Sequence, residues 1–211
     1  MAVYGRCTLR NLFDDSPTPH IAHPPRTHHR HFYVATDGSY RESGGGLGVV
    51  IETHDGERVA RLSVPDSPPD NNVAEYRALH LGLDVLAARA PPTARVGVLV
   101  DHANLAANVN TATILAQDAD WLPHHQFTIP TRAEHHWRGI RARICGFAEL
   151  RAAQISSGDN PAHSLANAPD QYGHVNNEPP RCVLPQPFDV PHSPSETGVP
   201  PPSRADRHAG D

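Results

Sequence analysis

Three acidic residues stand at places in the sequence where chemistry is expected. Asp37 follows an aromatic and β-branched run, Glu75 lies near the start of an amphipathic stretch, and Asp101 ends a continuous apolar run. Side chains at the carboxyl ends of central strands face the crevice where α/β sheets bind ligands. Carboxylates gathered there repel one another unless cations neutralise them, and oxygen ligands favour Mg²⁺ or Mn²⁺. Together the acids predict a divalent-metal site, although a turn, a first-turn acid and a helix N-cap would explain each one singly.

Five strands and several helices are predicted to position these acids. Aromatic, β-branched and apolar runs predict strands at 31–36, 47–53, 57–64, 94–101 and 151–157. Helical spacing or a helix-start signal predicts helices at 73–90, 103–110, 132–150 and from Asn160 onward. The Asp-Gly pair at 55–56 is typical of a tight hairpin turn. The order βββαβααβα predicts an α/β fold with a five-stranded mixed sheet, three strands antiparallel and the others parallel, flanked by helices.

The folded unit is predicted to occupy only part of the chain. A chain of 211 residues is longer than one such domain needs, and its 22 Pro are unevenly distributed. We expect a Pro/His-rich extended arm at 1–31, one domain at 32–169 and a Pro-rich, disordered tail at 170–211. The histidines of the arm could bind a metal, but no Cys or carboxylate spacing supports such a site, and a solvated tail is the simpler interpretation.

The composition also limits the cellular setting. No apolar run reaches the roughly 18 residues of a membrane helix, and residues 1–13 contain no apolar core of a secretory signal. The three cysteines are odd in number and far apart, which favours neither a disulfide framework nor a paired zinc site. We therefore expect a cytoplasmic monomer without a membrane partner.

The charge of the chain restricts how it would bind nucleic acid. The net charge is −5, and all 18 basic residues are arginine. Bulk positive charge is therefore not available, and metal ions or a local basic patch must supply the attraction. The most basic predicted element is the helix at 132–150, where Arg138 and Arg141 share a face and are candidates for phosphate contact. A solvated polar face explains them equally well.

Five short segments carry a resemblance to a known family. These are DGS at 37–39, GGGLGVVI at 44–51, NNVAEYRALHLGL at 71–83, VLVD at 98–101 and NPAHSLANA at 160–168. In this order they resemble type 1 ribonuclease H, in particular its archaeal and bacterial forms without the basic protrusion. The resemblance implies a ribonuclease H-like fold and hydrolysis of the RNA strand of RNA–DNA hybrids. It also implies two divalent ions, products with 5′-phosphate and 3′-hydroxyl ends, and a role in removing RNA primers and stray hybrids.

The resemblance also implies roles for individual residues. Asp37 would bridge both ions, Glu75 would hold the ion nearer the leaving group, and Asp101 would be a further ligand. The family has an aspartate at the fourth ligand position, where this chain has His163. Asp159 is the alternative fourth ligand. An imidazole in place of a carboxylate favours Mn²⁺ over Mg²⁺, so we expect an active enzyme with that preference.

Contacts with the substrate are implied by the same motifs. Glycines allow a close approach to a sugar, and the asparagines at the helix start match a position that contacts bases or sugars. The predicted substrate-binding residues are Gly38, Ser39, Gly44, Gly45, Gly46, Asn71, Asn72, Arg138 and Arg141. A flexible hairpin loop would explain the glycines at 44–46, and a helix N-cap would explain either asparagine.

Two other functions remain open from the sequence. Loss of the fourth acid is compatible with a catalytically impaired module that only binds nucleic acid. Other nucleases of the same fold use similar acid clusters. The motifs at 37–39 and 71–83 favour ribonuclease H over both.

Overall fold

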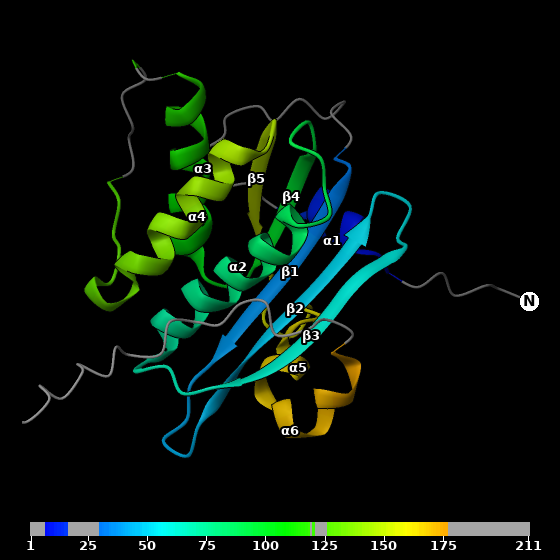
Figure 1. The fold of residues 1–211 in the computed structure, drawn as a ribbon, viewed down its shortest axis with the longest axis vertical. Helices are drawn as coiled ribbons and strands as arrows, with labels where there is room; N and C mark the ends of the chain where they lie inside the picture. Colours follow the sequence, from blue (N-terminus) through cyan, green and yellow to red (C-terminus); the bar gives the residue numbers. More distant parts are fainter. Residues whose placement is uncertain (1–6, 17–29, 119, 121–125, 177–211) are drawn as a thin grey trace, which may run out of the picture.

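The computed structural model describes residues 7–16, 30–118, 120 and 126–176. Within these residues lies one five-stranded sheet in the order β3-β2-β1-β4-β5 (Figure 1). The strands are β1 (Phe32–Ser39), β2 (Gly45–Thr53), β3 (Arg58–Asp66), β4 (Arg95–Val100) and β5 (Glu149–Gln154). β1, β2 and β3 are antiparallel neighbours, whereas β4 is parallel to β1 and to β5. The predicted fold class is confirmed.

Three long helices cover one face of the sheet. They are α2 (Asn71–Ala87), α3 (Ala103–Gln117) and α4 (Glu134–Gly146), the last preceded by a 3₁₀ turn at Thr131–Ala133. Alternate strand residues, such as Val34 on β1 and Val49 on β2, pack under these helices in the larger of two apolar clusters. Among the helices that the structure describes, none is both long enough and apolar enough to cross a membrane.

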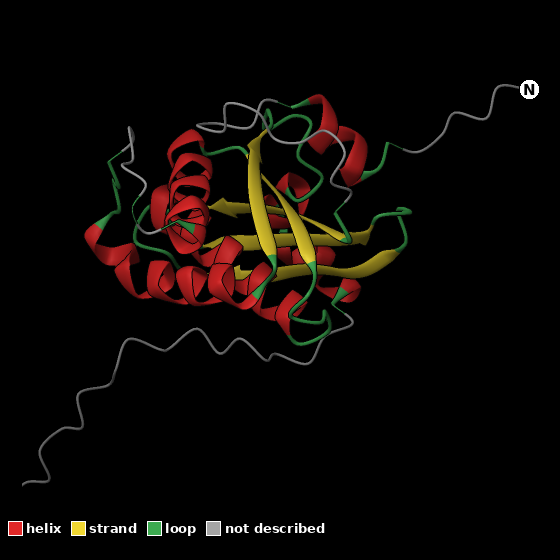
Figure 2. Cartoon of the chain, turned by 90° about the horizontal axis from the view of Figure 1, so that it is seen from above, coloured by secondary structure: helices red, strands yellow, loops and turns green. Residues whose placement is uncertain are grey.

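Short helices cover the opposite face, so that helices lie on both sides of the sheet (Figure 2). They are α1 (Leu9–Asp15) and α5 (His163–Asn167), followed by α6 (Pro169–Tyr172) and a 3₁₀ turn at Gly173–Val175. Leu9 and Phe13 of α1 are buried against Tyr33 and Val50, which point to this face. The predicted extended arm is therefore wrong for residues 9–15, which form a packed helix. The Pro/His-rich remainder of the arm lies outside the described residues.

α5 sits directly on the backbone of β2. A Cβ at Gly48 would lie 2.2 Å from the Ala162 carbonyl oxygen, so only glycine admits this approach. Two strand hydroxyls then satisfy carbonyls of α5: Ser63 Oγ donates to Leu165 O at 2.6 Å, and Ser39 Oγ donates to Ala166 O at 2.9 Å. Short contacts of this kind fix a five-residue helix that could not form alone in water.

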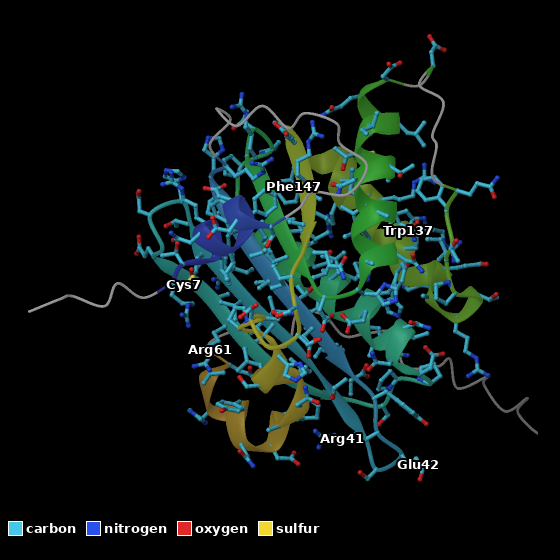
Figure 3. All side chains as sticks on the ribbon, turned by 180° about the vertical axis from the view of Figure 1, so that it is seen from behind. Cys7, Arg41, Glu42, Arg61, Trp137 and Phe147 are labelled. Carbon is cyan, nitrogen blue, oxygen red and sulfur yellow. The ribbon has the colours of Figure 1, made fainter. Side chains whose placement is uncertain are left out.

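The β1–β2 hairpin is tied to the end of α5. Figure 3 shows Arg41 and Glu42 on this hairpin, and Arg41 Nη2 donates to Asn167 Oδ1 at 3.2 Å. Gly44 turns the hairpin with a positive φ of 110°.

Several predicted boundaries shift. α3 runs on to Gln117, β5 begins and ends earlier than the predicted 151–157, and α4 ends at Gly146. Residues 169–175 form short helical turns instead of the start of a disordered tail. The helix predicted from Asn160 onward, α5, begins only at His163. Contacts of Asn160 within the candidate site accompany this later start.

Candidate metal centre

The carboxyl end of β1 carries Asp37, whose side chain is buried. Asp37 is 2% exposed, and burial raises the pKa of its carboxyl to about 7, with the charge of Asp101 as the second cause. A carboxylate is kept ionised in such a place only if a cation joins it. A cation bound next to Asp37 would therefore stabilise its ionised form.

Glu75 lies beside Asp37 because β1 and α2 touch backbone to backbone. A Cβ on Gly38 would lie 2.2 Å from the Ala74 carbonyl carbon, so glycine is required for this contact. The Gly38 N–H donates to the Glu75 carboxylate, which partly offsets the rise in the pKa of Glu75 caused by burial and by Asp101 and Asp37. Glu75 Oε2 is buried and has no hydrogen-bond partner among the described residues.

Asp101 closes the cluster from the end of β4 and is half-buried. Ser157 Oγ donates to Asp101 Oδ2 at 2.6 Å, which fixes the carboxylate from the loop after β5. We call Asp37, Glu75 and Asp101 the acid cluster. The structure brings these three predicted acids together, two from the ends of the adjacent strands β1 and β4 and one from α2.

His163 is the first residue of α5 and reaches the acid cluster from the face of the sheet opposite α2. Its Nδ1 lies 3.3 Å from Asp37 Oδ2, while about half of the side chain (48%) is exposed. One ligand atom from each of Asp37, Asp101 and His163 lies within 4.8 Å of the others. Asp159 does not join this group, because it is exposed and accepts a hydrogen bond from Ser156 Oγ at 2.7 Å.

Asn160 positions His163 in a way that the sequence did not predict. As the helix-start signal at this residue predicts, Asn160 Oδ1 accepts from the Ala162 N–H at 3.0 Å, which is the bond of a helix N-cap. Asn160 is also buried, and its Nδ2 donates to the Thr36 carbonyl at 2.9 Å. The segment before α5 is therefore fastened to the residue next to Asp37, and the helix begins only at His163.

These residues fit a divalent cation. Three carboxylates and one imidazole are the donor set that Mg²⁺ or Mn²⁺ accepts, with the imidazole suited better to Mn²⁺. The buried and unpartnered Glu75 Oε2 is the observation that decides the fit, since a buried polar atom normally has a partner. A cation in the acid cluster would supply it.

The predicted substrate contacts occupy three regions. Gly38, Ser39, Gly45 and Gly46 lie on β1 and β2, where Ser39 and the glycines also make the packing contacts of α2, α5 and the hairpin. Asn71 and Asn72 are exposed at the start of α2, where Asp70 is the N-cap, so capping does not explain either asparagine. Arg138 and Arg141 are exposed on α4, which packs against α2 and α3 rather than beside the acid cluster.

Sequence reasoning missed two residues that touch this site. Ser157 holds Asp101, and His102 lies between Asp101 and α3, where its Nε2 is 3.0 Å from Asn72 Oδ1. No sequence signal marked His102, because histidine is not among the residues that commonly cap helices.

No protein-family model matches the chain, and no curated protein matches its sequence. Solved structures with a similar fold include RNase H1 of the halophilic archaeon Halobacterium salinarum NRC-1, with 21% identity, a TM-score of 0.49, and coverage of 66% of this chain and 97% of that chain. LC11-RNase H1, a metagenomic protein from compost solved with an RNA/DNA hybrid, has 22% identity, a TM-score of 0.49, and coverage of 64% and 93%. A Mycobacterium tuberculosis N-terminal RNase H domain has 19% identity, a TM-score of 0.47, and coverage of 69% and 95%. All three are ribonuclease H domains.

Proposed function

We propose that this chain is an endoribonuclease that hydrolyses the RNA strand of RNA–DNA hybrids with two divalent ions, Mg²⁺ or Mn²⁺. The observation that carries the proposal is the convergence of Asp37, Glu75 and Asp101 with one carboxylate oxygen buried and unpartnered. Such a cluster has no structural benefit of its own, because buried carboxylates without cations destabilise a fold. A cation requirement is the function that explains its presence.

Each residue of the acid cluster, together with His163, would have its own role in holding the ions. Asp37, which is next to His163 and shares the cluster with Glu75 and Asp101, would hold both ions. The ions would supply activation of water and stabilisation of the charge that develops on the phosphate. His163, being half-exposed, would be the fourth ligand at the open side of the site.

The chemistry of the proposed reaction is a single displacement at phosphorus. The oxygen of water forms the new bond to phosphorus, and the bond to the ribose 3′ oxygen breaks. The attacking water gives up a proton to solvent and the leaving 3′ oxygen takes one from solvent, which leaves 3′-hydroxyl and 5′-phosphate ends. The substrate would be recognised as a hybrid through contacts in its wide minor groove, for which Asn71 and Asn72 at the start of α2 are exposed.

Cleavage assays test this proposal directly. End-labelled RNA–DNA hybrid, duplex RNA and duplex DNA are incubated with the full chain and either Mg²⁺ or Mn²⁺. We expect cleavage of the RNA strand of the hybrid alone, faster with Mn²⁺, and no cleavage by the Asp37→Asn variant. Binding of the hybrid without cleavage under any metal would instead indicate a catalytically impaired binding module, and cleavage of duplex DNA would indicate another nuclease of this fold.

A further inference from the structure

One imidazole connects the two helices that begin beside the acid cluster. His102 follows Asp101 and is the N-cap of α3, where its Nδ1 accepts from the Leu105 N–H at 3.1 Å. The other ring nitrogen, Nε2, lies 3.0 Å from Oδ1 of Asn72 on the first turn of α2. His102 therefore makes a side-chain contact with each of the helix starts that flank Asp101.

The first of these contacts determines the direction of the second. A neutral imidazole carries hydrogen on one ring nitrogen only. Because Nδ1 of His102 accepts from a backbone N–H, the hydrogen must be on Nε2, and Nε2 must donate to Asn72. The amide of Asn72 then turns its oxygen toward His102 and its NH₂ group away.

The helix itself does not need the Asn72 side chain. Asp70 caps α2 by accepting from the Val73 N–H at 2.9 Å, and Asn72 is exposed. The amide is thus held by His102 with its two donor hydrogens free for an external acceptor.

We propose that His102 is a positioning residue that fixes Asn72 with only hydrogen-bond donors facing the substrate. The inference rests on the proposed function. In the minor groove every base pair offers acceptors, purine N3 or pyrimidine O2, whereas guanine alone adds an NH₂ donor. A fixed donor suits all sequences equally. An amide free to turn could present its oxygen to guanine, so His102 keeps recognition independent of sequence.

The test compares two substitutions that differ in one contact. Serine in His102→Ser retains a hydroxyl for capping α3 but does not reach Asn72, whereas His102→Ala removes both contacts. We expect His102→Ser to raise the KM for the hybrid about three- to tenfold, the worth of one hydrogen bond, with kcat unchanged. We also expect its cleavage positions along a mixed-sequence hybrid to shift toward G·C pairs. His102→Ala should add a loss of thermal stability.

Variants of Asn72 identify the residue through which His102 acts. In an Asn72→Ala background, His102→Ser should have no further effect on KM or on the cleavage positions. Asn72→Asp still accepts from His102 but cannot donate, so it should weaken hybrid binding as much as Asn72→Ala or more. The inference is overturned if His102→Ser raises KM equally in the wild-type and Asn72→Ala backgrounds. It is also overturned if His102→Ser changes neither KM nor the cleavage positions.

Two measurements separate this inference from the proposed function. Nitrogen chemical shifts of His102 in the full chain should show Nδ1 unprotonated and Nε2 protonated, and the reverse tautomer overturns the inference without any substrate. If the wild-type chain does not cleave the hybrid with Mg²⁺ or Mn²⁺, the proposed function fails and the inference fails with it. If it cleaves the hybrid and His102→Ser leaves KM and the cleavage positions unchanged, only the inference fails.

Discussion

Helix α2 carries two buried groups of titratable side chains, and burial shifts their pKa values in opposite directions. Near its start Glu75 belongs to the acid cluster, where the pKa values of Glu75 and Asp37 are raised. Further along, the Nδ1 atoms of His80 and His136 of α4 are 3.3 Å apart. Burial lowers the pKa of both imidazoles, to about 4 for His136.

The difference between the two groups lies in their partners, not in the size of the shifts. The histidine pair is satisfied from within: the rings contact each other, and Asp84 reaches His80 at 3.6 Å while binding Arg143 at 2.6 Å. The acid cluster retains a buried oxygen without a partner and opens to solvent through His163. A shifted pKa therefore does not distinguish a binding site from a packed core. What distinguishes the acid cluster is that several carboxylates meet with a half-exposed imidazole and that, within the part of the chain the structure describes, no internal cation balances them.

The largest contrast is expected from Glu75→Gln. With metal and hybrid present, we expect turnover to fall on the order of a thousandfold, about 4 kcal/mol of barrier, because a ligand of the reacting ions is lost. Without metal at pH 8, the same change should raise the free energy of unfolding by about 1–3 kcal/mol, because a buried charge is removed. Hybrid cleavage and chemical denaturation in EDTA measure the two effects. A destabilised metal-free variant would show that the carboxylate has a structural role.

His163 is expected to give the next largest effect on turnover. His163→Ala removes a ligand at the open side of the site and should reduce cleavage about 10- to 100-fold, whereas His163→Asp should retain activity and tolerate Mg²⁺ better. Rates measured against Mg²⁺ and Mn²⁺ concentration check both variants. Wild-type rates in His163→Ala would restrict the metal site to the three acids.

The two groups should contribute opposite slopes, over nearly the same pH range, to the pH dependence of metal-free stability. The folded-state pKa of Asp37 is about 7, above its unfolded value of 3.8, so stability is lost as pH rises through that window, by up to about 4 kcal/mol. The folded-state pKa of His136 is about 4, below its unfolded value of 6.5, so stability is lost as pH falls, by up to about 3 kcal/mol.

Because the two windows overlap between about pH 4 and pH 6.5, the contributions should largely cancel in the wild type. In unfolding curves from pH 4 to pH 8 in EDTA, Asp37→Asn should leave a stability that falls as pH falls, and His136→Gln a stability that falls as pH rises. A divalent metal should restore stability at high pH only. The same slope in both variants would contradict the assignment.

The smallest effect on catalysis is expected from the histidine pair. His136→Gln should change thermal stability by about 1 kcal/mol while kcat and KM for the hybrid stay at wild-type values, since the pair packs α2 on α4 and does not face the acid cluster. Circular dichroism with cleavage kinetics tests this. A large fall in kcat would mean that the two groups on α2 are coupled.

The parts of the fold that were predictable follow from local patterns. Alternation and apolar runs located the strands, and the strand ends then determined that Asp37 and Asp101 would meet. Asn160 makes the capping bond that its residue type suggests, but α5 begins only at His163, and the second bond of Asn160, to Thr36, joins residues too distant in sequence to predict. Contacts of Ser157 and His102 depend on loop conformation, which no periodicity encodes.

α1 was the missed element, although Leu9, Leu12 and Phe13 have helical spacing. A helix this short is stable only when it packs against another surface, so it can be predicted only if that surface is known. For α1 the surface is the face of the sheet opposite α2.

Helix α1 determines where the chain can be divided for expression. Phe13 packs edge-on against Tyr33 with ring centroids 5.7 Å apart, and the Leu9 N–H donates to Glu52 Oε2 at 3.0 Å. A fragment that began at residue 32 would leave Tyr33 and Val50 open to water on a broad strand surface, the kind of surface that leads to self-association. Aggregation of such a fragment would then result from the absence of α1 from this face of the sheet and would say nothing about catalysis. The functional unit to express starts ahead of α1.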